Sequence, residues 1–146
     1  MKVLFVCEEN RNRSQIAAAI FNKMSKRDHA VSAGMATKPG SDGTMLRKAL
    51  NNPVLPMKIE GYDLSRARIK RLNRAMLKSA DKVILIRSKK ALHGVMPSIL
   101  RGLPDVEWWD VNIISEGTPF DEYCRLEKKR IKKIRALVKG LVKQIE

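Results

Sequence analysis

The chain has 146 residues, of which 44% are apolar and 31% charged, a composition typical of a folded domain rather than a disordered or fibrous chain. Two cysteines are too few for a disulfide-stabilised secreted scaffold, and no apolar run approaches the roughly 18 residues that a membrane span needs. We therefore expect one domain over residues 1–146, without a secretory signal or membrane span, in the reducing environment of the cytoplasm.

The charge is strongly positive. Lys and Arg total 30 against 15 for Asp and Glu, which gives a net charge of +15. Such an excess attracts anions, and it keeps nucleic acid or another polyanion open as a partner. A basic, solvated surface without a ligand has the same composition, so charge alone selects no partner.

The first third of the chain predicts a strand, a helix and a second strand. Residues 2–6 are an apolar run rich in β-formers, which is typical of a buried strand. Apolar residues then recur at helical spacing over residues 14–24. A second strand is predicted over residues 29–32, closed by Ala33 and Gly34. A polar loop therefore separates the first strand from the first helix.

The middle of the chain predicts two helical segments and a strand. We expect a helix from about Ser41 to Leu50, ended by Asn51, Asn52 and Pro53. Ser65 is a candidate cap for a basic helical turn, and Asn73 for a short helix through Lys78. Residues 82–86 are the clearest central strand after the first.

The last third predicts one more strand and a long amphipathic helix. Residues 106–111 are the strand candidate. Thr118, Pro119 and Asp121 resemble a helix start, with Thr as the N-cap and Pro at the first position. Alternating strands and helices predict an α/β fold, a three-layer sandwich in which helices flank a short, four-stranded parallel sheet.

The polar loop after the first strand contains the residues most suited to catalysis. An open parallel sheet binds its ligand beyond the carboxyl ends of its strands, where loop amides and a helix N-terminus attract an anion. Cys7 would lie at the base of this loop, where a helix N-terminus and an arginine favour the thiolate. Arg13 could bind a phosphate with two parallel hydrogen bonds, and Ser14 could donate to the sulfur. Asn10 is a residue type that tolerates a left-handed backbone.

These residues resemble the low-molecular-weight protein tyrosine phosphatase family. Its signature, Cys-x5-Arg-Ser after the first strand with Asn inside the loop, is matched by Cys7, Asn10, Arg13 and Ser14. With Asn12 as well, the loop is also similar to that of related phosphatases acting on the phosphoserine tail of RNA polymerase II. Three further segments match in the right order: residues 31–34, 61–65 and 80–86. The resemblance implies a flavodoxin-like fold of the phosphotyrosine phosphatase I type.

The resemblance also implies a mechanism. Cys7 attacks phosphorus and forms a phosphocysteine, which water then hydrolyses. Arg13 and the loop stabilise the phosphoryl oxygens, and neither metal nor cofactor is needed. The substrate is then a phosphorylated protein or a small phosphomonoester. The loop positions that would bind the phosphate are Glu8, Glu9, Asn10, Arg11, Asn12 and Ser14.

The chain departs from the family where an aspartic acid should protonate the leaving group. The family places this residue in a hydrophobic-Pro-Asp-Pro loop after the last strand, and without gaps the acid position falls on Ile113. Asp110, three residues earlier, is the first candidate for the acid, followed by Glu116 and Asp121. The alternative for Asp110 is a strand-end carboxylate paired with a nearby basic residue.

Other departures bear on competing functions. Asn12 stands where the family has a second loop cysteine, and Cys124 is expected to be a half-buried structural thiol, which argues against an arsenate reductase with a thiol relay. His29 and His93 have no ligand partners in sequence, so no metal site is predicted. The leading hypothesis is a cysteine-dependent phosphatase. The alternative is a weakly catalytic or inactive relative that binds phosphorylated protein or nucleic acid through the loop and the basic surface.

Overall fold

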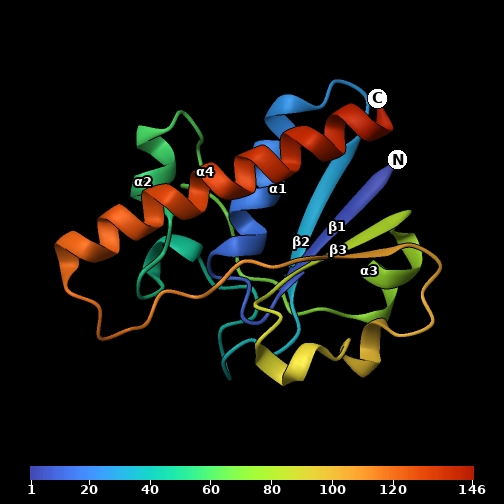
Figure 1. Cartoon of the computed structure of the whole chain (residues 1–146), viewed down its shortest axis with the longest axis horizontal. Coiled ribbons are helices and arrows are strands. Elements are labelled where there is room, and N and C mark those ends of the chain that lie inside the picture. The colour runs from blue at the N-terminus through green and yellow to red at the C-terminus, as the bar shows by residue number, and fades with distance from the viewer.

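The computed structural model describes the backbone of residues 1–146 and every side chain except those of Ala91 and Leu92. Its centre is a four-stranded, all-parallel sheet in the order β2-β1-β3-β4 (Figure 1). The strands are β1 (Lys2–Cys7), β2 (His29–Gly34), β3 (Lys82–Ile86) and β4 (Val106–Trp109). The predicted α/β fold with four parallel strands is confirmed.

The strand order places a switch point at β1. The chain passes from β1 to β2 on one side and later returns to β3 on the other side. Cys7 is the last residue of β1 and pairs with Gly34, the last residue of β2. An open α/β sheet binds ligands at such a switch point, so the fold places the loop after Cys7 where a site is expected.

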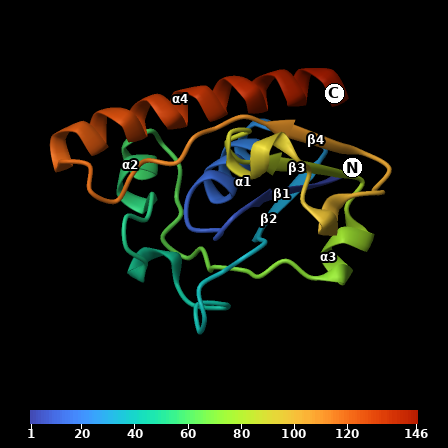
Figure 2. The same ribbon diagram turned by 60° about the horizontal axis from the view of Figure 1, so that its bottom comes forward.

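Helices cover both faces of the sheet (Figure 2). The helices α1 (Arg13–Met24) and α4 (Phe120–Ile145) pack together on one face, with α2 (Val54–Ile59) beside the first half of α4. The other face carries α3 (Arg74–Ser79) and the 3-10 turn η3 (Ser98–Leu100). Two further 3-10 turns are η1 (Leu46–Lys48) and η2 (Ala91–Gly94).

Alternate residues of β1 point into two separate apolar cores. Val3 and Phe5 face α1 and α4, whereas Leu4 and Val6 face α3 and η3. The Phe5 ring lies 6.0 Å from the Phe21 ring and 5.6 Å from the Trp109 ring, between centroids. β1 is buried on both faces, which is why its sequence is a continuous apolar run.

Two of the predicted helical segments are wrong. Instead of a helix from Ser41 to Leu50 there is only η1, and α2 begins after Pro53, where the predicted helix should have ended. Gly43 explains the difference, because its φ of 81° lies in the left-handed region and a helix cannot continue through it. At Ser65 there is a turn in which Asp63 Oδ1 accepts the Ser65 N–H, at 2.8 Å, so Ser65 caps no helix.

The other helix caps and strand ends are closer to the predictions. Asn73 caps α3 as predicted, because its Oδ1 accepts the Met76 N–H at 2.9 Å. The N-cap of α4 is Pro119 rather than Thr118, since Pro119 keeps an extended backbone with ψ of 146°. The last strand ends at Trp109, two residues before the predicted end, because the chain then turns toward the loop after β1.

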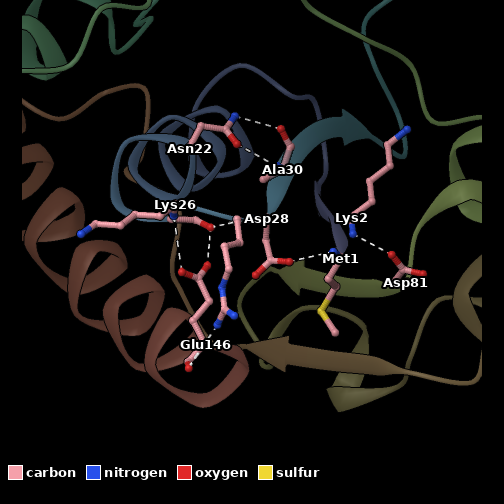
Figure 3. A network of polar contacts seen from close by, with 10 residues as sticks. Met1, Lys2, Asn22, Lys26, Asp28, Ala30, Asp81 and Glu146 are labelled. Atoms are coloured by element: carbon pink, nitrogen blue, oxygen red, sulfur yellow. Dashed lines mark hydrogen bonds and ion pairs between the residues drawn. The ribbon is translucent and has the colours of Figure 1, made fainter.

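Both termini lie at the amino ends of the strands (Figure 3), whereas Cys7 is at the carboxyl end of β1. The amino group of Met1 pairs with Asp28 Oδ1 at 2.7 Å, and the Lys2 N–H donates to Asp81 Oδ2 at 2.7 Å. The side chain of Glu146 accepts from the Lys26 N–H at 3.4 Å. These contacts tie the last turn of α4 to the loop before β2. No helix in the described part of the chain is both long and apolar enough to cross a membrane.

Candidate active site

The site is built on the loop of residues 7–14, here called the phosphate loop, which joins β1 to α1. Cys7 is buried, and its Sγ lies 2.9 Å from Ser14 Oγ. Asn10 has a φ of 59°, the left-handed conformation expected of it from the sequence. The loop therefore curls so that its last residue, Ser14, returns to the sulfur of its first.

The side chain of Asn10 holds this curl in place and is fully buried. Its Oδ1 accepts the Lys70 N–H at 2.8 Å, which fixes the orientation of the amide. Its Nδ2 then donates to Ser14 Oγ at 2.8 Å and to Ser32 Oγ at 3.0 Å. Because the Ser14 oxygen already accepts from Asn10, the Ser14 hydroxyl proton is free to point at Cys7 Sγ. Ser14 is thus a donor suited to a thiolate.

The end of β2 and the two residues after it pack against the phosphate loop. The Met35 N–H donates to the Cys7 carbonyl at 2.9 Å, and the Ala36 N–H donates to the Glu8 carbonyl at 2.7 Å. A Cβ at Gly34 would lie 2.7 Å from the carbonyl carbon of Glu9. Only glycine lets the strand approach the loop this closely.

Arg13 is the first residue of α1 and is buried. Its Nη1 donates to the Val111 carbonyl at 2.9 Å, which ties the segment after β4 to the phosphate loop. Burial lowers the pKa of Arg13, while the nearby Cys7 opposes that shift. Arg13 and Cys7 line the same cavity, where a bound anion would replace the solvation that the guanidinium has lost.

A cavity of about 360 Å³ opens above Cys7. The phosphate loop contributes its floor: Cys7, Glu8, Glu9, Arg11, Asn12 and Arg13. Segments distant in sequence contribute the walls: Leu50, Asn51, Ile113, Ile114, Glu116, Tyr123 and Arg130. The walls are partly apolar, whereas the floor offers positive charge and a thiol.

The two carboxylates in the phosphate loop are both paired with arginines. Glu8 Oε2 lies 3.0 Å from Arg87 Nη1, and Glu9 Oε2 accepts from Arg11 Nε at 2.7 Å. Pairing offsets much of the repulsion that these carboxylates would exert on a phosphate. The acidic pair in the sequence is therefore compatible with an anion site.

The structure places the acid candidates differently from the sequence prediction. Asp110 does not line the cavity: its Oδ1 accepts the Lys89 N–H at 2.8 Å, and its carbonyl accepts from Lys133 Nζ at 2.6 Å. Asp121 does not line it either, whereas Glu116 does. Ile113, on which the ungapped spacing places the expected acid, also lines the cavity. This geometry fits a strand-end carboxylate that accepts the Lys89 N–H better than a catalytic acid.

Sequence reasoning missed the contribution of α4. Tyr123 and Arg130 line the cavity, although the sequence showed them only as part of a basic amphipathic helix. Cys124 is exposed, so the expectation of a half-buried thiol was wrong. No pattern near these residues marks the site, because the fold alone brings α4 to the phosphate loop.

Among the side chains that the structure describes, no three His, Cys, Asp or Glu lie together in a way that could hold a metal ion. The side chains that line the cavity include a thiol, guanidinium groups and one exposed carboxylate, Glu116.

A buried cysteine at the end of the first parallel strand, with an arginine six residues later that lines the same cavity, defines a phosphatase-type site. Residues 2–98 match the model of a family described as low molecular weight phosphotyrosine protein phosphatase, and the chain belongs to this family. The match ends before β4 and the loop that contains Ile113. No curated protein sequence matches the chain.

Solved structures of similar fold cover the whole chain. A low molecular weight protein tyrosine phosphatase from T. tengcongensis is 28% identical, with a TM-score of 0.73 over 99% of both chains. The YwlE arginine phosphatase from Geobacillus stearothermophilus is 19% identical, with a TM-score of 0.75 over 99% of this chain and 92% of that one. An arsenate reductase in its phosphate-binding state is 18% identical, with a TM-score of 0.72 over 99% and 98%.

The last two likenesses show the shared fold alone. The family match and the tyrosine phosphatase structure together identify the protein as a hydrolase with a cysteine-based, phosphatase-type activity. Its substrates are accordingly phosphorylated molecules.

Proposed function

We propose that the protein is a protein tyrosine phosphatase that hydrolyses phosphomonoesters through a phosphocysteine on Cys7. The observation that carries the proposal is the contact of Cys7 Sγ with the Ser14 hydroxyl, 2.9 Å away, at the floor of a cavity also lined by Arg13. A thiolate with a hydroxyl donor on one side and a guanidinium nearby is suited to nucleophilic attack and to later departure.

The reaction takes two steps. In the first, the Cys7 thiolate attacks phosphorus, the S–P bond forms, and the P–O bond to the leaving group breaks. Arg13 and the amides of the phosphate loop hold the three phosphoryl oxygens during the transfer. In the second, water attacks phosphorus and gives a proton to the carboxylate that protonated the leaving group, the S–P bond breaks, inorganic phosphate is released, and Cys7 remains as a thiolate that accepts the hydrogen bond of Ser14.

Phosphotyrosine is the preferred substrate class because of the cavity walls. Leu50, Ile113, Ile114 and the ring of Tyr123 form an apolar rim that suits an aromatic leaving group. The fold shared with an arginine phosphatase makes phosphoarginine the comparison substrate of most interest. The net charge of +15 is the one observation in favour of a nucleic-acid partner, and it does not select one.

Glu116 is our proposed acid for the leaving group. It is the one carboxylate on the cavity wall that no described ion pair engages. Glu116→Gln is expected to lower kcat for phenyl phosphate by about 10²-fold and to have little effect on p-nitrophenyl phosphate, whose leaving group needs no proton. Asp110→Asn is the matched control, expected to keep the parent's rate. A lower kcat for phenyl phosphate in Asp110→Asn, with the parent's rate in Glu116→Gln, would reassign the acid to Asp110.

The substrate proposal is tested with a panel of phosphotyrosine, phosphoserine and phosphoarginine peptides of one sequence. The proposal predicts the highest kcat/KM for the phosphotyrosine peptide. A preference for phosphoarginine would retain the cysteine mechanism and overturn the substrate. If no substrate is turned over and vanadate still binds, the protein is the non-catalytic phosphate-binding relative, which the isoleucine at position 113 favours.

A further inference from the structure

A buried carboxylate on α4, Glu127, has no part in the two steps above. Its side chain is 1% exposed. Its Oε2 accepts from Asn12 Nδ2 at 3.0 Å, from the Tyr123 hydroxyl at 3.1 Å and from Arg130 Nη2 at 2.8 Å. One carboxylate therefore gathers three donors, and one of them belongs to the phosphate loop.

Fold stability is a weak explanation for this cluster. Removing a carboxylate and a guanidinium from water costs more than their attraction usually returns, and apolar residues of similar size commonly serve a core as well or better. The rest of the inner face of α4 is indeed apolar, as at Ile131 and Ile134. The ion pair interrupts that face only where the helix reaches the phosphate loop.

Asn12 is the link between the cluster and the loop. It occupies the N-cap position of α1, where an asparagine oxygen normally accepts a backbone N–H of the first turn. Here the side chain makes no such cap, and Asn12 Oδ1 is buried without a partner among the described residues. The amide nitrogen must face Glu127, because a carboxylate only accepts. The Asn12 side chain thus binds Glu127 of α4 instead of capping α1.

Arg130 brings the cluster to the reacting centre. It lines the cavity together with Cys7 and Arg13. Burial is the main reason why the pKa of Arg13 is lowered, and the positive charge of Arg130 adds to it. Two guanidinium groups this near each other repel, and Glu127 offsets the charge of one of them.

We propose that Glu127 and Arg130 are positioning residues that act through Asn12. The ion pair on α4 holds the Asn12 side chain, and this contact fixes the orientation of the adjacent Arg13 and of the last loop amides toward a bound oxyanion. The proposal rests on the proposed function, since it concerns the same phosphate loop. It names residues of α4, beyond the part of the chain that matches the family model.

The test measures oxyanion binding, which needs no turnover. Tungstate affinity is determined by calorimetry for the full chain and for Glu127→Gln, Asn12→Ala and the double variant. We expect each single variant to weaken binding about tenfold and the double variant to be no weaker than the singles, because coupled residues are non-additive. Glu60→Gln is the control: it breaks the 3.0 Å pair between Arg135 of α4 and Glu60 at the end of α2, and it is expected to bind as the parent does.

Two results would overturn the proposal: parent-like affinity in Asn12→Ala, or losses in the double variant that multiply. Asn12→Ala removes one partly exposed side chain, so it keeps the test valid if Glu127→Gln does not fold. Arg130→Lys keeps the positive charge but lacks the paired N–H donors of the guanidinium. It is expected to retain more tungstate affinity than Arg130→Met, which loses the charge as well.

Turnover separates this proposal from the proposed function. Tungstate binding that depends on Glu127, in a protein without hydrolysis, would sustain the positioning role and refute the phosphatase. Hydrolysis in the parent, together with tungstate affinity and hydrolysis that are unchanged in Glu127→Gln and Asn12→Ala, would support the phosphatase and refute the positioning role.

Discussion

Replacing Asn10 separates the two roles that the structure gives this residue. Asn10→Gly removes the side chain but tolerates a φ of 59°, whereas Asn10→Ala removes the side chain and also strains the backbone. In both variants the part-buried Lys70 N–H and the buried side-chain amide of Gln15 lose an acceptor, and the hydroxyls of Ser14 and Ser32 lose a donor.

The magnitudes follow from these contacts. An orphaned buried donor costs about 1–3 kcal/mol, and the serine hydroxyls recover part of their loss by rotating, so Asn10→Gly should lower the free energy of unfolding by about 3 kcal/mol. The left-handed backbone costs Asn10→Ala about 1 kcal/mol more. Alanine should therefore be the less stable of the two, the reverse of the usual order in which glycine is worse.

Urea denaturation of the parent and both variants measures this difference, with the midpoint as the readout and an unchanged slope as the check on two-state unfolding. Asn112→Ala is a suitable control, because it removes an exposed asparagine outside the phosphate loop. If Asn10→Ala is as stable as Asn10→Gly or more so, the left-handed conformation at the centre of the loop is refuted.

Three further changes test other parts of the site. Gly34→Ala would place a Cβ 2.7 Å from the backbone of Glu9, and we expect it to lower the unfolding free energy by about 1–3 kcal/mol and to weaken oxyanion binding, whereas parent-like binding would contradict the close approach. In the Glu116→Gln variant, Ile113→Asp adds a carboxylate to the cavity wall and should recover up to about 10²-fold in kcat for phenyl phosphate, with a rate that falls as the pH rises above the range in which the new carboxyl is protonated, whereas no recovery would contradict the placement of residue 113 beside the leaving group. Desolvation, with Glu127 nearby, raises the pKa of Tyr123 to about 12, so its protonated form is favoured in the fold. The resulting contribution to stability is present below pH 10 and is lost as the pH rises through about 12. In a Tyr62→Phe variant, phenolate absorbance should appear near pH 12, and a midpoint near 10 would contradict the partial burial of Tyr123 beside Glu127.

The phosphate loop could be predicted from sequence because its determinants are local. Strand β1 is a buried apolar run, and the residues that follow it have the types that a left-handed turn, a thiolate and a helix start require. The same holds for β3, whose predicted and observed bounds coincide.

The walls of the site could not be predicted, because they depend on contacts between distant segments. Tyr123 and Arg130 reach the cavity only because α4 packs across α1. Asp110 had the right chemistry in the right region, but the chain turns after Trp109 and directs that carboxylate to the Lys89 amide. Spacing along a strand end does not reveal such a turn.

Helix α4 shows a second feature that the sequence pattern does not reveal. The sequence predicts a long amphipathic helix at this end of the chain, and residues of its basic run such as Lys128 and Lys132 are exposed. Within the same run, however, Arg130 is buried against Glu127. Composition and periodicity describe the helix as a whole and miss the one basic residue that faces the site.

The measurement that tests the central claim most directly is the hydrolysis of p-nitrophenyl phosphate by the parent, Cys7→Ser and Cys124→Ser, with mass spectrometry of the rapidly quenched parent. The account predicts turnover in the parent and in Cys124→Ser, none in Cys7→Ser, and one added phosphoryl group on the peptide that contains Cys7. Turnover that survives in Cys7→Ser, or a phosphoryl group on another residue, would contradict it.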